Sequence, residues 1–413
     1  MMRCINREPA SLAAARRHPP SAHAEFADDL SVRSRDVSVA LQVVFWVAVG
    51  LLVYAQAGYA VLLAVLAGLR RRRPPPPAVE EPDVSLIVAA YREGDVIAAK
   101  VADALALDYP RERLEVIVAC DGADQATVER ARAAGADLVL ELPRAGKTAA
   151  QDAAVRRARG EVLAFSDANA RWRPDALRAL VAPFADADVG YVCGSLELVD
   201  EGGTNQEGVY WRYETALRAL ESRVGSVTAG NGAIYAVRRA AYVELDAASS
   251  HDLAFPFTMV KQGRRAVFAP DARATERPVP SIEGEFARKR RMMRRGWPIV
   301  LRGGMLSPRG YGPAYALMIA SHRVLRYATP FLHLIALAAN VALVAIGSGP
   351  LYVVTLALQA ALLAAALLAP LAPLRPLLLA RYYVLTTASP AAGLWAWLRR
   401  GALPAWDPAE GAR

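Results

Sequence analysis

The 413-residue chain has few cysteines and few charged residues. Its three cysteines, Cys4, Cys120 and Cys193, show no paired spacing, which excludes a disulfide-rich scaffold and gives no zinc pattern, and which fits a reducing compartment. Charged residues make up 22% of the chain and hydrophobic residues 54%, so a disordered chain is excluded. The formal net charge of +9 indicates contact with a membrane surface or with phosphate groups.

Charge is absent altogether from two long stretches. No charged residue lies between Asp36 and Arg70, or between Arg326 and Arg375. A helix needs about 20 apolar residues to cross a bilayer. We therefore predict a transmembrane helix over 37–69 and, because the second stretch is interrupted at Gly347–Pro350, a transmembrane hairpin over 327–372. The segment 373–413 contains a shorter apolar run that is either a third span or an interfacial helix, followed by a tail.

The residues that flank the first span predict its orientation. Arg70–Arg73 follow it directly, and arginines at the end of a span mark the cytoplasmic side. A proline run, Pro74–Pro77, makes 70–83 a stiff linker. Residues 1–36 are predicted to be a disordered tail. We expect a multi-pass protein of the cell (inner) membrane whose central region is cytoplasmic.

The central region, 84–300, alternates strand and helix signals. Such alternation predicts an α/β fold with a mostly parallel sheet that helices cover on both faces. Short buried-strand runs occupy 84–90, 114–119, 137–142, 162–165 and 189–192, and helical patterns occupy 95–106, 124–134, 147–158 and 174–184.

Polar residues follow three of the predicted strands. They are Tyr91-Arg92-Glu93, Asp121-Gly122 and Ser166–Asn169. Ligands of parallel sheets bind beyond the carboxyl ends of the strands, so these residues are candidates for a binding site. Each one alone could also be a turn or a helix cap.

Seven short motifs occur in this region in a fixed order. They are Ala89–Glu93, Cys120–Gly122, Arg144–Lys147, Phe165–Asn169, Gly230–Tyr235, His251-Asp252 and Arg291–Trp297. Together they resemble the motifs of the family 2 glycosyltransferases with the GT-A fold, and the flanking spans resemble the membrane-bound branch of that family, which includes polysaccharide synthases. The resemblance covers about 84–297, and it implies inverting transfer of a sugar from a nucleotide-diphosphate donor.

The resemblance implies roles for residues on the donor side. Asp121, Tyr91 and Glu93 would line the nucleotide pocket, with a UDP-sugar favoured as donor. Asp167 and Asn169 stand where the family has an Asp-x-Asp pair, and two such oxygens can hold a divalent cation, Mg²⁺ or Mn²⁺, against the diphosphate.

Lys147 is predicted to contact the donor phosphates. It follows a glycine, as the lysine of a phosphate-binding P-loop does, but Glu141 occupies the position where that loop needs its first glycine, so a P-loop is excluded.

On the acceptor side, the resemblance makes Asp252 the general base. Its alternative role is that of a helix cap. His251 replaces the glutamate that the family usually has there, and it would orient the base, contact the acceptor or lie on the surface. Asn231 follows Gly230 in a stretch that lies near the acceptor in relatives.

The densest basic run, Arg288–Trp297, has two interpretations. Arg291, Arg294 or Arg295 could clamp the leaving diphosphate while Trp297 forms a wall for the acceptor sugar. The run could equally be a basic amphipathic helix on anionic lipids, followed by an interfacial segment over 301–326. We expect no nucleic-acid partner, because no basic module with interleaved aromatics appears elsewhere.

The sequence thus predicts a metal-dependent glycosyltransferase that adds a hexosyl or N-acetylhexosaminyl group to a glycan or lipid-linked acceptor at the membrane, in polysaccharide or glycolipid assembly. Addition of a single sugar is favoured over processive synthesis, because the arginine–tryptophan motif is altered and the spans are few. A non-catalytic subunit of a polysaccharide synthesis or export complex is the alternative, since His251 and Asn169 depart from the family pattern.

Overall fold

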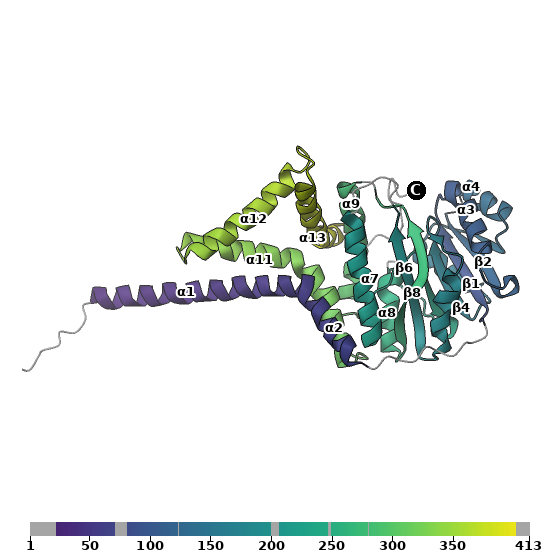
Figure 1. The fold of residues 1–413 in the computed structure, drawn as a ribbon, viewed down its shortest axis with the longest axis horizontal. Helices are drawn as coiled ribbons and strands as arrows, with labels where there is room; N and C mark the ends of the chain where they lie inside the picture. The colour runs from purple at the N-terminus through teal and green to yellow at the C-terminus, as the bar shows by residue number, and fades with distance from the viewer. Residues whose placement is uncertain are drawn as a thin grey trace, which may run out of the picture.

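The computed structural model describes residues 22–70, 81–122, 124–199, 206–246, 249–279 and 281–401, with backbone alone for 22–34 and 206–210. Its centre is an eight-stranded sheet in the order β3-β2-β1-β4-β7-β6-β8-β5 (Figure 1). The strands are β1 (Val84–Ala90), β2 (Leu114–Asp121), β3 (Leu138–Leu142), β4 (Val162–Asp167), β5 (Arg171–Trp172), β6 (Val189–Leu198), β7 (Tyr235–Arg238) and β8 (Arg265–Glu276).

The sheet has a parallel half and a mixed half. Strands β3, β2, β1 and β4 are all parallel, so their carboxyl ends share one edge of the sheet. Strand β7 is antiparallel to both of its neighbours, β4 and β6, while β6 and β8 are parallel and β5 closes the edge antiparallel to β8. The predicted α/β class with a mostly parallel sheet is confirmed.

Helices cover both faces because the central strands are apolar on both faces. Every residue of β1 is buried, as expected of an inner parallel strand. Val88 packs with α3 and α4, whereas its neighbour Ile87 packs with α5 and α8. The helices and helical turns of this domain are α3 (Gly94–Leu105), η2 (Arg111–Arg113), α4 (Gln125–Ala133), α5 (Lys147–Val155), α6 (Ala176–Val181), η3 (Ala182–Ala185), α7 (Gln206–Val224), η4 (Arg239–Ala241), α8 (His251–Lys261) and α9 (Ile282–Leu301).

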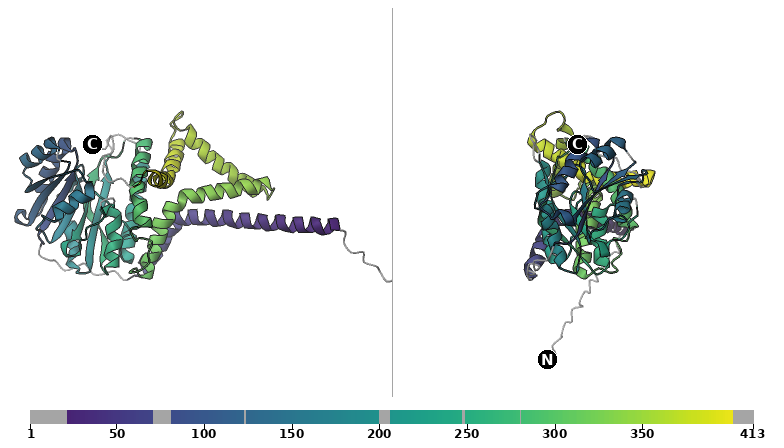
Figure 2. Two further views of the ribbon diagram at one scale, coloured as in Figure 1. Left: turned by 180° about the vertical axis from the view of Figure 1, so that it is seen from behind. Right: turned by 90° about the vertical axis from the view of Figure 1, so that its right-hand side faces the viewer.

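A second group of helices extends away from the α/β domain (Figures 1 and 2). Its elements are α1 (Ala22–Val53), the π-helical turn η1 (Tyr54–Gly58), α2 (Tyr59–Leu69), α10 (Pro313–Met318), the π-helical turn η5 (Ile319–Leu325), α11 (Arg326–Ala345) and α12 (Pro350–Leu368). Within the described residues, three helical segments are long and apolar enough to cross a membrane, namely Arg35–Leu69, Pro313–Ala345 and Pro350–Leu368.

Helix α1 begins earlier than the sequence predicts. Residues 22–36, expected to belong to a disordered tail, form its first turns, and 1–21 lie outside the described residues. Helices α1 and α11 lie side by side, and polar contacts fasten α1 to the hairpin: the Ser38 and Ser348 hydroxyls are 3.1 Å apart, and Trp46 Nε1 donates to Tyr352 Oη.

The last helix, α13 (Arg375–Arg400), packs along α9 at the edge of the α/β domain. Its Gly393 lies against the backbone of Arg290 and Arg294, where a Cβ atom would come within 3.0 Å of each. Among the described helices it is not one of the three that are apolar enough to cross a membrane, and its role as a third span or an interfacial helix stays a prediction.

Candidate active site

A cavity of about 1240 Å³ opens between the sheet, helix α9 and the membrane helices. We call the part around Glu93, Lys147, Asp167, Asn169 and Glu276 the sheet end, and the part around Gln56, Arg323, Arg326, Tyr327 and Tyr382 the membrane end. The predicted site residues that line the cavity are Glu93, Lys147, Asp167, Asn169, Asn231, Asp252, Arg291 and Arg295. Residues from six distant segments of the chain therefore meet in one place.

The sheet end is built around an ion pair between Lys147 and Asp167. Asp167 is the last residue of β4, and Lys147 begins α5 after Gly146, whose φ of +100° is a conformation that side chains disfavour. Burial, the largest influence, lowers the pKa of Lys147, but the charges of Asp167 and Asp252 outweigh it and hold the pKa above its ordinary value. Lys147 thus stays a cation in a partly buried position.

Glu276, at the end of β8, also lines the sheet end, and the sequence analysis missed it. Its Oε1 is buried without a hydrogen-bond partner among the described residues. Burial, and next the charge of Asp167, raise the pKa of Glu276 to about 7. Its position after a strand was the available signal, but no strand was predicted there.

These oxygens fit a divalent cation. Asp167 and Asn169 offer a carboxylate and an amide oxygen two residues apart, and the orphaned carboxylate of Glu276 lies close enough to Asp167 to shift its own pKa. In the described part of the chain no three His, Cys, Asp or Glu side chains form a complete metal site by themselves. A cation here would need further oxygen ligands, which a diphosphate can supply.

Asp252 lies in the first turn of α8 and lines the cavity. The cap of this helix is Ser250, so Asp252 is not the helix cap that was its alternative role. The adjacent His251 points elsewhere: its Nδ1 is 2.8 Å from Tyr235 Oη, and the ring is 4% exposed among aromatic side chains. Burial, and next the charge of Lys147, lower the pKa of His251 to about 3, so it is neutral and fixes the start of α8 instead of lying on the surface.

Asp121 and Tyr91 lie behind the sheet end and do not line the cavity. The Asp121 carboxylate, 2% exposed, accepts hydrogen bonds from the backbone N–H groups of Ala145 (2.7 Å) and Gly146 (3.1 Å to each oxygen). It therefore holds the loop that presents Lys147. The Arg144 guanidinium stacks on the Tyr91 ring at 3.6 Å from its centroid.

Asn231 lines the cavity, but its side chain bonds to the backbone. Its Nδ2 donates to the Gly194 carbonyl (2.6 Å), and its Oδ1 accepts from the N–H groups of Ala233 and Ile234. These bonds fix the turn before β7, which brings Gly232 next to Asp167 and Lys147.

The basic run on α9 divides between two surfaces. Arg291 and Arg295 line the cavity. Arg294 instead donates to the carbonyls of Gly401 (2.9 Å) and Arg400 (3.0 Å) at the end of α13, and Trp297 Nε1 donates to the Pro390 carbonyl (2.8 Å). The Trp297 ring is 8% exposed and does not line the cavity, so these two residues join α9 to α13.

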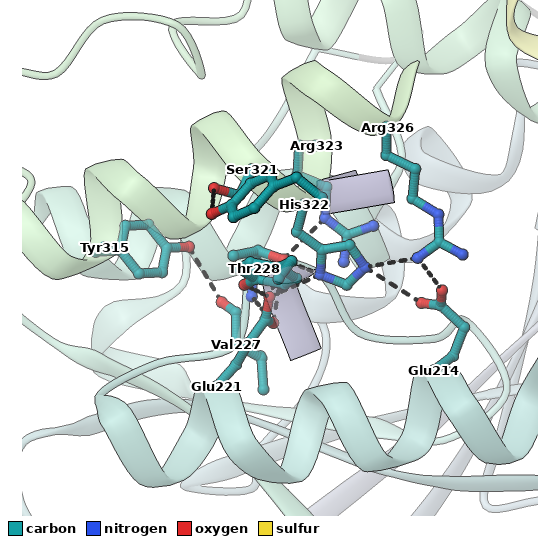
Figure 3. A network of polar contacts seen from close by, with 11 residues as sticks. Glu214, Glu221, Val227, Thr228, Tyr315, Ser321, His322, Arg323 and Arg326 are labelled. Atoms are coloured by element: carbon teal, nitrogen blue, oxygen red, sulfur yellow. Dashed lines mark hydrogen bonds and ion pairs between the residues drawn. The ribbon is translucent and has the colours of Figure 1, made fainter. Parts of the chain in front are cut away.

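A buried polar network joins α7 to the membrane helices (Figure 3). Glu221 accepts from Tyr59 Oη (2.7 Å) and Thr228 N (2.9 Å) and lies 2.7 Å from His322 Nδ1. Glu214 pairs with Arg326 at 2.5 Å. The sequence does not indicate this network, because α7 and the helices that complete it are far apart along the chain: Glu221 and His322, for example, are 101 residues apart.

Residues 82–295, about half of the chain, match the family described as "Glycosyltransferase like family 2". The chain belongs to this glycosyltransferase family. It is 26% identical over 230 residues to an N-acetylglucosaminyltransferase of Rhizobium sp. (strain N33), covering 50% of this chain and 51% of the relative. An N-acetylglucosaminyltransferase of Rhizobium meliloti (strain 1021) is 28% identical over 214 residues, covering 46% and 50%. The chain thus spans about half the length of these relatives.

A solved structure is similar over almost its whole length. The mannosyltransferase PcManGT from Pyrobaculum calidifontis, in complex with GDP-Man and Mn²⁺, superposes with a TM-score of 0.66 at 25% identity, covering 88% of this chain and 99% of that one. The similarity extends beyond the glycosyltransferase domain into the flanking helices, because the matched family segment alone is about half of this chain. The predicted family and the GT-A fold are confirmed.

Proposed function

We propose that this glycosyltransferase moves a sugar, with inversion, from a nucleotide-diphosphate donor to an acceptor hydroxyl at the cytoplasmic face of the cell membrane. The observation that carries the proposal is the single cavity in which Asp252, the Lys147–Asp167 pair and the arginines of α9 face one another. The acceptor is a glycan or a lipid-linked glycan, since the cavity continues between the membrane helices.

Asp252 acts as the general base. As the acceptor oxygen forms its bond to the anomeric carbon, its proton passes to the Asp252 carboxylate, and the bond from that carbon to the diphosphate oxygen breaks. The nucleoside diphosphate leaves with the electron pair. The start of α8 is held by the neutral His251 ring bonded to Tyr235, so the carboxylate keeps its position through the step.

Lys147, Arg291 and Arg295 bind the diphosphate and stabilise the charge that builds on it as it leaves. Asp121 acts indirectly, through the backbone of the loop that carries Lys147. Asp167 and Asn169, with Glu276 beside them, would hold Mg²⁺ or Mn²⁺. When bound, the cation neutralises negative charge on the diphosphate. PcManGT was solved with Mn²⁺ and GDP-Man, which supports this assignment.

The nucleotide of the donor and the side of the membrane on which the α/β domain lies rest on different observations. We predict a UDP-sugar from the sequence, whereas the structural relative binds GDP-Man, so donors of both kinds belong in the first assays.

Arg70–Arg73 after the first span favour a cytoplasmic α/β domain. Labelling of engineered cysteines with an impermeant reagent in intact cells and in inverted vesicles measures the orientation.

Turnover of a panel of UDP- and GDP-sugars with Mn²⁺ or Mg²⁺, by protein purified in detergent with a membrane lipid extract as acceptor, tests the activity. We expect Asp252→Asn to lower kcat by about 10²–10⁴-fold while the donor Kd stays unchanged. The matched control is Asp246→Asn, outside the cavity lining. Donor binding without turnover in the wild type, with Asp252→Asn indistinguishable from it, would favour the non-catalytic subunit instead.

A further inference from the structure

Two arginines that line the cavity are buried with unused hydrogen-bond donors. Arg218, on α7, is 5% exposed, and its Nε and Nη1 have no partner among the described residues. Arg323, in the π-helical turn η5, is 8% exposed; its Nε donates to Thr228 Oγ1 at 2.9 Å, but its Nη2 has no such partner. A buried guanidinium without acceptors is costly, since each unmade bond to a charged group forfeits about 1–3 kcal/mol.

The neighbouring carboxylates are engaged elsewhere. Glu214 pairs with Arg326 (2.5 Å) and lies 3.5 Å from His322 (Figure 3). Burial, the largest influence, raises the pKa of Glu214, but Arg326 and next His322 outweigh it and hold the pKa well below its ordinary value, so this carboxylate is ionised and committed. Glu221 receives bonds from Tyr59 and Thr228 and pairs with His322. Both carboxylates are near enough to Arg323 to interact with its charge, but among the described residues neither accepts a hydrogen bond from Arg218 or Arg323.

Arg218 meets an aromatic ring instead of an acid. Its guanidinium carbon lies 5.5 Å from the centroid of the Trp211 ring, a cation–π contact that leaves the N–H edge available. Arg323 lies within the candidate span Pro313–Ala345, in a π-helical turn that contacts the π-helical turn of the first span through Tyr54 and Ser321 (2.9 Å). Irregular turns of this kind are frequent where a helix serves a binding site.

We propose that Arg218 and Arg323 bind the phosphate group of a lipid-linked acceptor. This inference rests on the proposed function and names the acceptor class: a phosphate ester on a hydrocarbon chain. A phosphate offers several acceptor oxygens to the planar donor edges of two guanidinium groups. The hydrocarbon chain has a path, because the same cavity is lined by Gln56 of the first span and by Leu379 and Pro390 of α13.

The residues around Arg218 and Arg323 indicate that the bound phosphate belongs to a lipid and not to a soluble molecule. The donor diphosphate has its own cations at the sheet end, Lys147 and the α9 arginines, so Arg218 and Arg323 are not needed for it. Both lie at the junction with the membrane helices, and Arg323 belongs to a candidate span. These positions favour a ligand that comes from the bilayer.

Binding of dodecyl phosphate to the full-length protein in maltoside micelles tests the assignment, with inorganic phosphate and diphosphate as probes that lack a tail. We expect saturable binding of dodecyl phosphate, weakened about tenfold or more by Arg218→Gln and by Arg323→Gln. The matched control is Arg212→Gln, which removes the same charge from an exposed position of α7. Without ligand, Arg218→Gln should melt at or above the wild-type temperature, because it removes an unpaired buried charge.

Equal weakening by all three variants, or none by any, would overturn the proposal. Inorganic phosphate or diphosphate that binds as tightly as dodecyl phosphate, with the same dependence on Arg218 and Arg323, would overturn the lipid assignment. A lower melting temperature of ligand-free Arg218→Gln would show a structural role and count against a ligand site. Binding of the nucleotide sugar is measured in parallel. If the wild type binds dodecyl phosphate but no nucleotide sugar, the proposed function fails while the anion site stands.

Discussion

Glu276 has a buried carboxylate oxygen without a hydrogen-bond donor among the described residues, so replacing this side chain by a neutral one should stabilise the protein by an amount that depends on pH. Burial, and next the charge of Asp167, raise its pKa from the ordinary 4.5 to about 7. Below pH 4.5 the side chain is neutral in both folded and unfolded states and contributes no difference. As pH rises from 4.5 to 7, the unfolded chain loses the proton while the folded one keeps it, so the free energy of unfolding falls by about 1.4 kcal/mol per pH unit, roughly 3 kcal/mol in all.

Glutamine has the same shape and does not titrate. We therefore expect Glu276→Gln to melt at nearly the wild-type temperature at pH 5 and well above it at pH 8, by about 2–4 °C for each kcal/mol. Tryptophan fluorescence during heating in micelles with a chelator present measures both. Glu112→Gln, at an exposed position, is the matched control and should show no such trend. A difference between Glu276→Gln and wild type that is the same at every pH would refute the reasoning.

Three further variants test separate parts of the structure. Asp121→Ala leaves the N–H groups of the Lys147 loop without their acceptor. We expect the affinity for the donor, measured by calorimetry, to fall and the free energy of unfolding to fall by about 1–3 kcal/mol. Unchanged donor affinity would contradict the positioning role of Asp121. Glu221→Ala breaks a buried pair with His322 and should cost about 3–5 kcal/mol in thermal unfolding. Burial, the largest influence, raises the pKa of Glu221, but His322 and next Arg323 outweigh it and lower the pKa, so this stability is present above pH 4.5 and disappears as pH falls below it. Arg294→Gln should lower stability by about 1–2 kcal/mol without changing the donor Kd, since the side chain holds α13; a weaker donor Kd at unchanged stability would restore the clamp role that the sequence suggested.

The parallel half of the fold was predictable because its strands are continuous apolar runs. The strand expected over 84–90 has those bounds in the structure, and the helix expected over 95–106 runs from Gly94 to Leu105. The mixed half was harder. Strand β8 carries Asp271, Arg273 and Glu276 among its apolar residues, so it has no clean run and was not predicted.

The site residues that the sequence revealed are those marked by local motifs, whereas residues whose role depends on distant partners were not revealed. Asp167 and Asp252 were predicted from motifs, and both line the cavity. Trp297 and Arg294 belong to a motif too, but their partners come from α13, about a hundred residues further along the chain, and nothing local indicates that contact. Arg218 has the spacing of an ordinary helical surface residue, and only the packing of α7 against the membrane helices buries it.

Charged side chains with unused hydrogen-bonding atoms, of opposite sign, lie at the two ends of the cavity. Among the described residues, Glu276 Oε1 at the sheet end lacks a donor, while Nε and Nη1 of Arg218 and Nη2 of Arg323 lack acceptors. Pairing these groups with each other would have been the stable solution for a protein that binds nothing, because unmatched buried charges cost stability. Their separation is explained if each end awaits a ligand of opposite charge, a cation with its nucleotide diphosphate at one end and a lipid phosphate at the other. Asp252, which lines the same cavity, then removes a proton from an acceptor whose phosphate is already anchored.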